Sequence, residues 1–303
     1  MPASADIERI TIVELMEQFG SEDACHDALE ELRWPDGVAC LRCGSVKISR
    51  IKKRRQFECV DCFYQFSVRA GTIFHDSKLP LWKWFLCIYM MVESKKGISA
   101  NQIKRMLGIS YKTAWYLCHR IRAAMKEETP APLVGHVEMD DTYVGGKLWG
   151  KGKSARVTNK TVVIGAVSRG GDLRMQAVPN RGGKTFKKFI DKNIGDAADT
   201  IYTDEYWPEG RLADENTKHL TIKHSKYQWV LPGNIHTNTI EGAWALLKRS
   251  IAGSYHKLSE KHLQSYLDEM AWRYNGRENQ YLFRDTLIEL LSAERLEYKN
   301  LVA

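Results

Sequence analysis

The chain has 303 residues and a formal net charge of +8, with 45 Lys and Arg residues against 37 Asp and Glu residues. This length predicts two or three domains, and the basic balance favours a polyanionic partner without proving one. No apolar run reaches the roughly 18 residues that span a bilayer, and the amino terminus lacks the pattern of a secretory signal. We therefore expect a cytoplasmic protein with no membrane partner.

The first predicted domain covers residues 1–72. Apolar residues at helical spacing predict one or two short helices over residues 11–32. From Trp34 to about Ser67 the pattern changes to short β-prone pieces bounded by cysteines and glycines. A segment this small needs cross-links rather than a large core to hold it together.

Four cysteines predict that cross-link. Cys40 and Cys43 form one C-x2-C pair and Cys59 and Cys62 another, with 15 residues between the pairs. This spacing is typical of a zinc ribbon, although four buried cysteines without metal are the alternative. Four thiolates leave no open coordination position, so one Zn²⁺ here would be structural.

The hairpin between the cysteine pairs is strongly basic, with Lys47, Arg50, Lys52, Lys53, Arg54 and Arg55. Such a surface suits the backbone of a DNA duplex, but a solvated charged face is the alternative. The three cysteines outside these pairs, Cys25, Cys87 and Cys118, lie in apolar helical patterns and are expected in the core.

The second predicted domain, residues 73–130, contains a candidate helix-turn-helix. Residues 98–106 and 110–121 have helix length, with Gly108 in the turn and Ser110 as the N-cap of the second helix. The groove-facing side of that helix would include Tyr111, Lys112, Thr113, Tyr116, His119 and Arg120. The alternative is a helical hairpin that packs against the rest of the protein and does not bind DNA. A linker is expected over residues 126–135.

The third predicted domain, residues 131–303, has a mixed α/β order. Three β-type runs are followed by a helix near residues 184–194, two further β runs, and a long helix from about Thr239. Asp140 lies in the first β run, Asp204 ends the fourth, and Glu241 lies in the first turn of the long helix.

These three acids predict a metal site. Carboxylates that converge from separate elements can bind two divalent cations, and oxygen ligands suit Mg²⁺ or Mn²⁺. Without cations their mutual repulsion would raise their pKa values. Lys248 lies two helical turns after Glu241 and could contact a phosphate.

Several motifs together resemble a known family. The chain contains WPDG before CLRCG, then ECVDC, ISYKTAWYLCHRIRAAM, VEMDDTYVGG, TDEY and HTNTIEGAWALLKRS. This series is similar to the bacterial DDE-type transposases of the insertion-sequence 1595 family over roughly residues 12–285.

The resemblance implies a ribonuclease-H-like catalytic domain with a five-stranded mixed sheet. It also implies magnesium-dependent cleavage and strand transfer of double-stranded DNA. The zinc ribbon and helix-turn-helix would recognise terminal inverted repeats. Two transposon ends must be joined, so a homodimer or larger assembly on DNA is implied, in association with the bacterial nucleoid.

The family pattern also implies site residues. Asp140 and Asp204 correspond to the first two metal ligands, and the third falls in the segment NTIEG, with 36 residues between it and Asp204 if it is Glu241. Asn238 competes with Glu241, which is favoured because a carboxylate binds a divalent cation better than an amide. Asp141 departs from the usual Glu at that position. A nuclease without strand transfer and a non-catalytic DNA-binding regulator are the rival functions.

Overall fold

The computed structural model describes residues 9–145, 160–204, 217–222, 232 and 235–303. These residues form two compact units. The first comprises the described residues up to Ser94 together with Ile98–Met125 and Glu278–Ala303, and the second comprises Lys95–Gly97 and the described part of Lys126–Arg277. The predicted division after residues 72 and 130 stays a prediction; the structure adds that the last 26 residues pack with the first unit.

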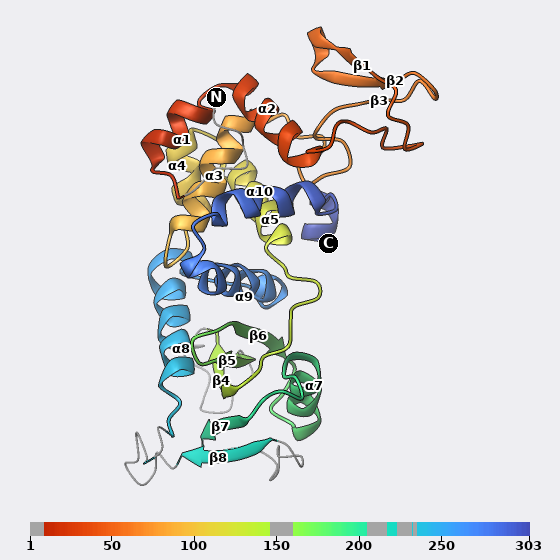
Figure 1. Ribbon diagram of the computed structural model, residues 1–303. Coiled ribbons are helices and arrows are strands. Elements are labelled where there is room, and N and C mark those ends of the chain that lie inside the picture. The colour runs from red at the N-terminus through yellow and green to blue at the C-terminus, as the bar shows by residue number, and fades with distance from the viewer. Residues whose placement is uncertain (1–8, 146–159, 205–216, 223–231, 233–234) are drawn as a thin grey trace. The chain divides into compact units, whose positions relative to one another are not determined.

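The first unit is mostly helical. Its helices (Figure 1) are α1 (Ile12–Phe19), α2 (Glu22–Arg33), α3 (Leu81–Glu93), α4 (Ala100–Leu107), α5 (Tyr111–Ala124), α10 (Leu282–Ser292) and α11 (Tyr298–Val302). Thr11 and Ser21 accept hydrogen bonds from first-turn amides and so begin the two predicted N-terminal helices. In the part of the chain that the structure describes, no helix has the length and apolarity needed to cross a membrane.

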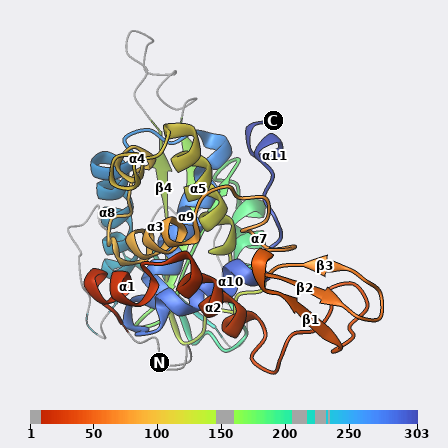
Figure 2. The same cartoon turned by 90° about the horizontal axis from the view of Figure 1, so that it is seen from above.

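The zinc ribbon is a three-stranded antiparallel sheet, the orange segment of Figure 2, formed by β1 (Ile48–Ile51), β2 (Gln56–Cys59) and β3 (Gln65–Phe66). Its apolar core is small. The Trp34 ring packs edge-on against Phe57 at 5.4 Å and Phe66 at 6.0 Å between centroids. Few other buried side chains support the sheet, so the sulfur cluster at its base is needed to hold it.

The predicted helical hairpin is present in α4 and α5. Gly108 ends α4 with a φ of 60°, a left-handed conformation that glycine adopts without steric cost. Ser110 caps α5 by accepting a hydrogen bond from the Thr113 amide, as predicted. The first turn of α5, with Lys112, is exposed.

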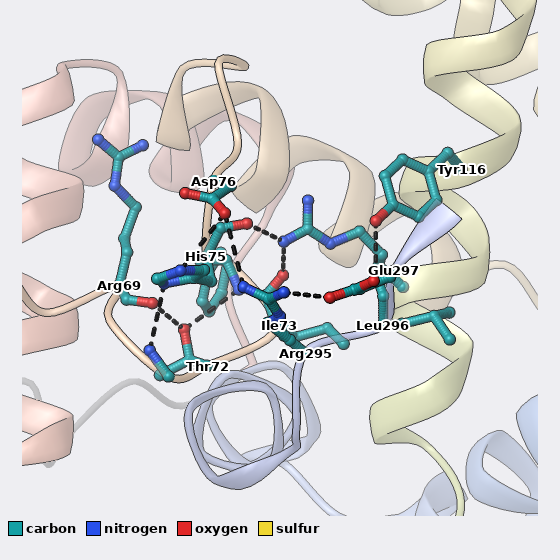
Figure 3. A network of polar contacts seen from close by, with 12 residues as sticks. Arg69, Thr72, Ile73, His75, Asp76, Tyr116, Arg295, Leu296 and Glu297 are labelled. Carbon is teal, nitrogen blue, oxygen red and sulfur yellow. Dashed lines mark hydrogen bonds and ion pairs between the residues drawn. The ribbon is translucent and has the colours of Figure 1, made fainter. Parts of the chain in front are cut away.

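The rest of α5 faces inward, which corrects one expectation. Arg120 donates hydrogen bonds to the carbonyls of Ile73 and His75, the latter at 2.7 Å, and the Tyr116 hydroxyl donates to the Leu296 carbonyl (Figure 3). His119 and Arg120 are only 1% and 5% exposed. The prediction that they face a DNA groove is wrong, because both side chains are buried within the protein and backbone carbonyls bind the Arg120 guanidinium.

The second unit contains the predicted five-stranded mixed sheet. Its strands are β4 (His136–Val144), β5 (Thr161–Ser168), β6 (Leu173–Val178), β7 (Thr200–Asp204) and β8 (Lys218–Ile222), in the spatial order β6-β5-β4-β7-β8. The pairs β4–β5 and β5–β6 are antiparallel, whereas β7 is parallel to both β4 and β8. The α/β fold class with a preceding ribbon is therefore confirmed.

Helices cover both faces of this sheet. Phe186 and Phe189 of α7 (Gly183–Asn193) pack on the face that carries Val137 and Met139. The opposite face packs against α8 (Asn238–Ser250) and α9 (Glu260–Asn275). A π-helical turn, Ile251–Tyr255, continues α8, and a 3-10 turn, Gly276–Glu278, follows α9. Because strand side chains alternate between faces, Glu138 and Asp140 lie on the α8 side of β4.

One close packing contact sets the distance between α8 and the sheet. Gly165 in β5 pairs with Asp140 in β4, and Trp244 of α8 lies over it. A Cβ at position 165 would lie 2.5 Å from Trp244 Cη2, well inside van der Waals contact. Glycine therefore allows the indole ring to approach the backbone of the sheet.

Paired glycine substitutions test this contact. Gly165→Ala is expected to lower the free energy of unfolding by about 1–3 kcal/mol, because Trp244 must move away from a well-packed core. Gly242→Ala is the control, since a Cβ there meets no atom within 4 Å and α8 should gain about 0.5–1 kcal/mol. Chemical denaturation measures both. Equal effects would show that Gly165 has no special packing role.

Candidate catalytic site and zinc centre

The four predicted zinc ligands meet at the base of the ribbon. Their sulfur atoms all lie within 4.8 Å of one another, with Cys40 Sγ 3.6 Å from Cys62 Sγ and Cys43 Sγ 3.5 Å from Cys59 Sγ. Zinc–sulfur bonds of about 2.3 Å in a tetrahedron place sulfurs about 3.8 Å apart. The cluster therefore has the dimensions and the donor chemistry of a structural zinc site.

The four thiols are not equivalent when no metal is bound. A backbone hydrogen bond at Ser45 lowers the pKa of Cys43, but neighbouring thiols outweigh it and raise that pKa to about 12, whereas the pKa of Cys40 is lowered. Burial acts to raise the pKa of the Cys40 thiol, but hydrogen bonds from the backbone at Cys43 and Arg42 and from neighbouring thiols outweigh burial and lower that pKa to about 6. The backbone thus stabilises a thiolate, which is the form that binds zinc.

Asp140 and Asp204 come together on adjacent strands. The parallel register pairs Glu138 of β4 with Tyr202 of β7. Continuing that register by two residues places Asp140 beside Asp204, with both side chains on the same face. The repulsion that Asp204 exerts on Asp140 agrees with this placement.

The pKa of Asp140 is raised from 3.8 to about 7. Burial is the main cause, and repulsion from Asp204 and Asp141 adds to it. Hydrogen bonds, including one of 2.9 Å from Trp244 Nε1 to Asp140 Oδ2, act in the opposite direction. The Asp140 carboxylate is thus costly to ionise in the protein alone, and a nearby cation would relieve that cost.

Asp141 has a different environment from Asp140. Its side chain points to the other face of β4, where Arg181 Nη2 donates a hydrogen bond of 2.6 Å to Asp141 Oδ1. Burial raises the pKa of Asp141, and Arg181 counteracts it. Asp141 is therefore held in an ion pair, whereas Asp140 receives an indole N–H and has no cationic partner among the described residues.

Glu138 joins the sheet to the beginning of α8. Its carboxylate is fully buried and accepts hydrogen bonds from the Thr239 amide at 2.7 Å, the Ile240 amide at 3.1 Å and the Thr239 hydroxyl at 2.9 Å. The residue before α8, Thr237, makes no side-chain cap of its own. A strand side chain therefore caps this helix in place of a local residue.

Two further side chains complete this anchor. Arg169 Nε donates to Glu138 Oε1 at 2.8 Å, and Arg169 Nη2 donates to the His236 carbonyl at 2.8 Å. The His236 ring also lies against the carboxylate, with Nδ1 3.1 Å from Glu138 Oε1. His236 therefore belongs to the set of contacts that positions α8.

The other predicted site residues, Glu241, Lys248 and Asn238, lie on α8 and are exposed. Glu241 Oε1 accepts a hydrogen bond from the Thr237 hydroxyl at 3.1 Å. Among the described residues, only the four cysteines form a group of three or more ligands close enough for one ion. The three predicted acids therefore do not form a group of that size, although the strand register makes Asp140 and Asp204 neighbours.

Sequence analysis assigned no role to Glu138, Arg169 or Arg181, and it treated Trp244 as a core residue only. Glu138 shares a strand face with Asp140, which was a usable signal because a buried carboxylate needs partners. Arg169, the partner of Glu138, follows β5, and Arg181, the partner of Asp141, follows β6. Local sequence patterns do not show which strand residue either arginine contacts.

Comparisons with known proteins agree with the two sites. Residues 132–275, which include all five strands and the three predicted acids, match the ISXO2-like transposase domain. Residues 20–65, which include the four cysteines, match the transposase zinc-ribbon domain. Both matched families are transposase domains, so these two parts of the chain are similar to transposases.

A similar protein is found in a mobile element. The chain is 26% identical over 269 residues to an uncharacterized protein in transposable element ISH50 of Halobacterium salinarum, which covers 82% of this chain and 89% of the relative. That organism is an archaeon, so a bacterial origin stays a prediction. A chain in the cryo-EM structure of the simian T-cell lymphotropic virus intasome with PP2A regulatory subunit B56 gamma aligns at a TM-score of 0.30 with 13% identity, covering 71% of this chain and 74% of that one. At that TM-score the likeness supports no conclusion.

The Glu138 anchor can be tested by removing its charge. Glu138→Gln is expected to lower the free energy of unfolding by about 3–5 kcal/mol, because Arg169 loses its buried counter-charge. Glu127→Gln is the matched control, since Glu127 is half exposed and only 3.6 Å from Arg174; its effect should be about 0–1 kcal/mol. Denaturant titration measures both, and similar small losses would contradict the anchoring role.

The raised pKa of Asp140 predicts a pH dependence. The folded state binds the Asp140 proton more tightly than the unfolded state, so the associated stability is complete below pH 3.8 and is lost as pH rises to about 7. Wild-type protein should lose more stability over this range than Asp140→Asn, and added Mg²⁺ should restore the loss. Thermal unfolding across this range measures the difference. Identical pH profiles, or no effect of Mg²⁺, would contradict the prediction.

Proposed function

We propose that the protein is a DNA transposase that binds the terminal inverted repeats of an insertion sequence and catalyses metal-dependent cleavage and strand transfer. The observation that carries this proposal is the juxtaposition of Asp140 and Asp204 on neighbouring central strands of a domain that matches a transposase family. Paired carboxylates of this kind are typical of phosphodiester chemistry with divalent cations.

In this proposal Asp140, Asp204 and Glu241 hold two Mg²⁺ or Mn²⁺ ions. When bound, the ions would activate the attacking oxygen and stabilise the leaving oxygen of the phosphodiester. The protein's own contribution is positioning. Trp244 orients the Asp140 carboxylate, and Arg181 engages Asp141, so that Asp140 is the member of the pair that faces Asp204.

The geometry of α8 favours Glu241 over Asn238 as the third ligand. Trp244 points at Asp140, so it marks the side of α8 nearest the carboxylate pair. At about 100° per residue, Glu241 lies about 60° from Trp244 around the helix, whereas Asn238 lies about 120° away. Lys248 lies within about 40° of Trp244 and is suited to contact a phosphate of the bound DNA.

The expected partner is double-stranded DNA at the transposon ends and in the target. The basic ribbon hairpin and the exposed first turn of α5 are the surfaces proposed to bind it. Joining two ends to one target requires at least two active sites, so a homodimer or larger assembly on DNA is part of the proposal. Its place of action would be the nucleoid in the cytoplasm.

An assay with purified protein, labelled terminal DNA, target plasmid and Mg²⁺ tests the proposal. Wild-type protein should form a strand-transfer product, and Asp140→Ala and Asp204→Ala should each reduce it by about 100-fold or more, because each removes a metal ligand. Glu241→Gln should have a similar effect, whereas Asn238→Ala should retain most of the activity.

The control is Asp191→Ala, which removes an exposed carboxylate from α7 on the opposite face of the sheet. It should leave strand transfer unchanged. Nicking without joining would instead identify a nuclease, and DNA binding without cleavage would identify a regulator. Loss of activity in Asn238→Ala but not in Glu241→Gln would reverse the assignment of the third ligand.

A further inference from the structure

A cleft lies between the tip of the zinc ribbon and helix α2. It has a volume of about 370 Å³ and is lined by residues of α2, of the turn between β1 and β2, and of the segment after β3. The lining side chains that carry charge or can titrate are Glu22, His26, Lys53, Arg54, Arg55 and Arg69. This size is within the range of small-ligand sites.

The cleft is strongly positive. Its four cations, against the single carboxylate of Glu22, leave a net charge of +3. Glu22 is already engaged, because its Oε2 accepts a hydrogen bond of 2.6 Å from the Leu81 amide. Within the described ranges, neither Lys53 nor Arg54 has an ion-pair partner, so their charges are available to an anion.

His26 supplies a second sign of a missing partner. It is 4% exposed, and its buried Nδ1 has no hydrogen-bond partner among the described residues. Its Nε2 lies 3.9 Å from Glu22 Oε1, which is too long for a hydrogen bond. Burial and the nearby Arg69 both lower the pKa of His26, so the neutral ring can carry its proton on Nδ1 and donate it.

The cleft is built by ion pairs that hold the ribbon tip against α2. Arg50 Nη2 lies 2.8 Å from Glu30 Oε2, and Arg55 pairs with Asp23. Arg55 has a φ of 49°, in the left-handed region that a residue with a side chain rarely adopts. These contacts orient Lys53 and Arg54, which stand in the 3-10 turn Lys52–Arg54 between the two paired residues.

Arg69 closes the cleft from the segment after β3. Figure 3 shows its guanidinium pointing away from the network formed by Asp76, Arg295 and Glu297. Its Nη1 donates one hydrogen bond of 3.3 Å to the Ser77 carbonyl, which leaves further N–H groups for another acceptor. The cleft is thus lined by Arg69, which a hydrogen bond holds in position, and by the unpaired cations Lys53 and Arg54.

We propose that this cleft binds a backbone phosphate of duplex DNA, with Lys53, Arg54 and Arg69 as its cationic ligands. The inference rests on the DNA binding included in the proposed function, and it assigns one phosphate contact to a defined place. Its chemistry recognises the phosphodiester rather than the bases, so the contact positions DNA without reading its sequence.

Affinity for a labelled random-sequence duplex, measured by fluorescence anisotropy over a range of salt concentrations, tests the proposal with the full chain. Loss of one phosphate contact lowers the slope of log affinity against log salt by about 0.9, which corresponds to about eightfold weaker binding at about 0.1 M salt. Lys53→Gln and Arg54→Gln should each approach this loss. Both positions are exposed, so the fold and bound zinc should be unchanged.

Lys52→Gln is the matched control. Lys52 is exposed in the same turn and loses the same charge, but it does not line the cleft. Its effect on affinity and slope should be much smaller. Equal effects of the three substitutions would overturn the proposal, since they would indicate only general attraction to the basic hairpin. Displacement of the duplex by polyglutamate at equal charge, with the same dependence on Lys53, would also overturn it.

The assay distinguishes failure of the phosphate site from failure of DNA binding by the whole protein. If wild-type protein binds the duplex with a clear salt dependence while Lys53→Gln and Arg54→Gln bind as tightly, the cleft is not a phosphate site and the transposase proposal is unaffected. If wild-type protein has no affinity for the duplex, the proposed function fails as well.

Discussion

The capping of α8 by Glu138 is the interaction on which the geometry of the candidate catalytic site depends. α8 carries Trp244, Glu241 and Lys248, and a helix can be rotated or translated on a sheet unless a directional contact holds it. The buried carboxylate provides that contact, because it accepts hydrogen bonds from two amides of the first turn and from Arg169. Trp244 over Gly165 then sets how closely the helix approaches.

Glu138 and Asp140 lie on the same face of β4 but differ in how well the protein compensates their charge. Glu138 has five polar contacts and is electrostatically satisfied within the protein. Asp140, two residues along, has a raised pKa because burial and neighbouring acids disfavour its charge. The charge of Asp140 is unfavourable without a cation, whereas the neighbouring Glu138 is held rigidly by its hydrogen bonds. This combination is typical of a metal centre, because a bound cation would relieve the electrostatic cost at Asp140.

The zinc ribbon solves a different physical problem. Its aromatic core is too small to hold three short strands, so four sulfurs supply the cross-link and ion pairs with α2 fix the orientation of the hairpin tip. Ion pairs engage Arg50 and Arg55, whereas Lys53 and Arg54 of the same hairpin line one cleft. The basic run in the sequence is thus divided into structural and unpaired cations, a division that composition alone does not reveal.

Much of the fold followed from the sequence because its signals are local. The cysteine spacing, Ser110 before α5, Gly108 after α4 and the β run around Asp140 depend on neighbouring residues, and each was confirmed. His119 and Arg120 were assigned to the wrong environment because helical periodicity shows that two faces exist but not which one a distant backbone segment covers. The loop at Ile73–His75 decided that question.

The sequence by itself determined the types of element and the four clustered cysteines, since these are set by residue chemistry and spacing along the chain. Only the tertiary structure decided that Asp140 and Asp204 are neighbours, that Asp141 pairs with Arg181 and that Glu138 caps α8. These relations join residues 40 to 101 positions apart in the chain, as in the Arg181–Asp141 and Thr239–Glu138 contacts. Such contacts arise from the pairing of strands and the packing of helices, which no local pattern specifies.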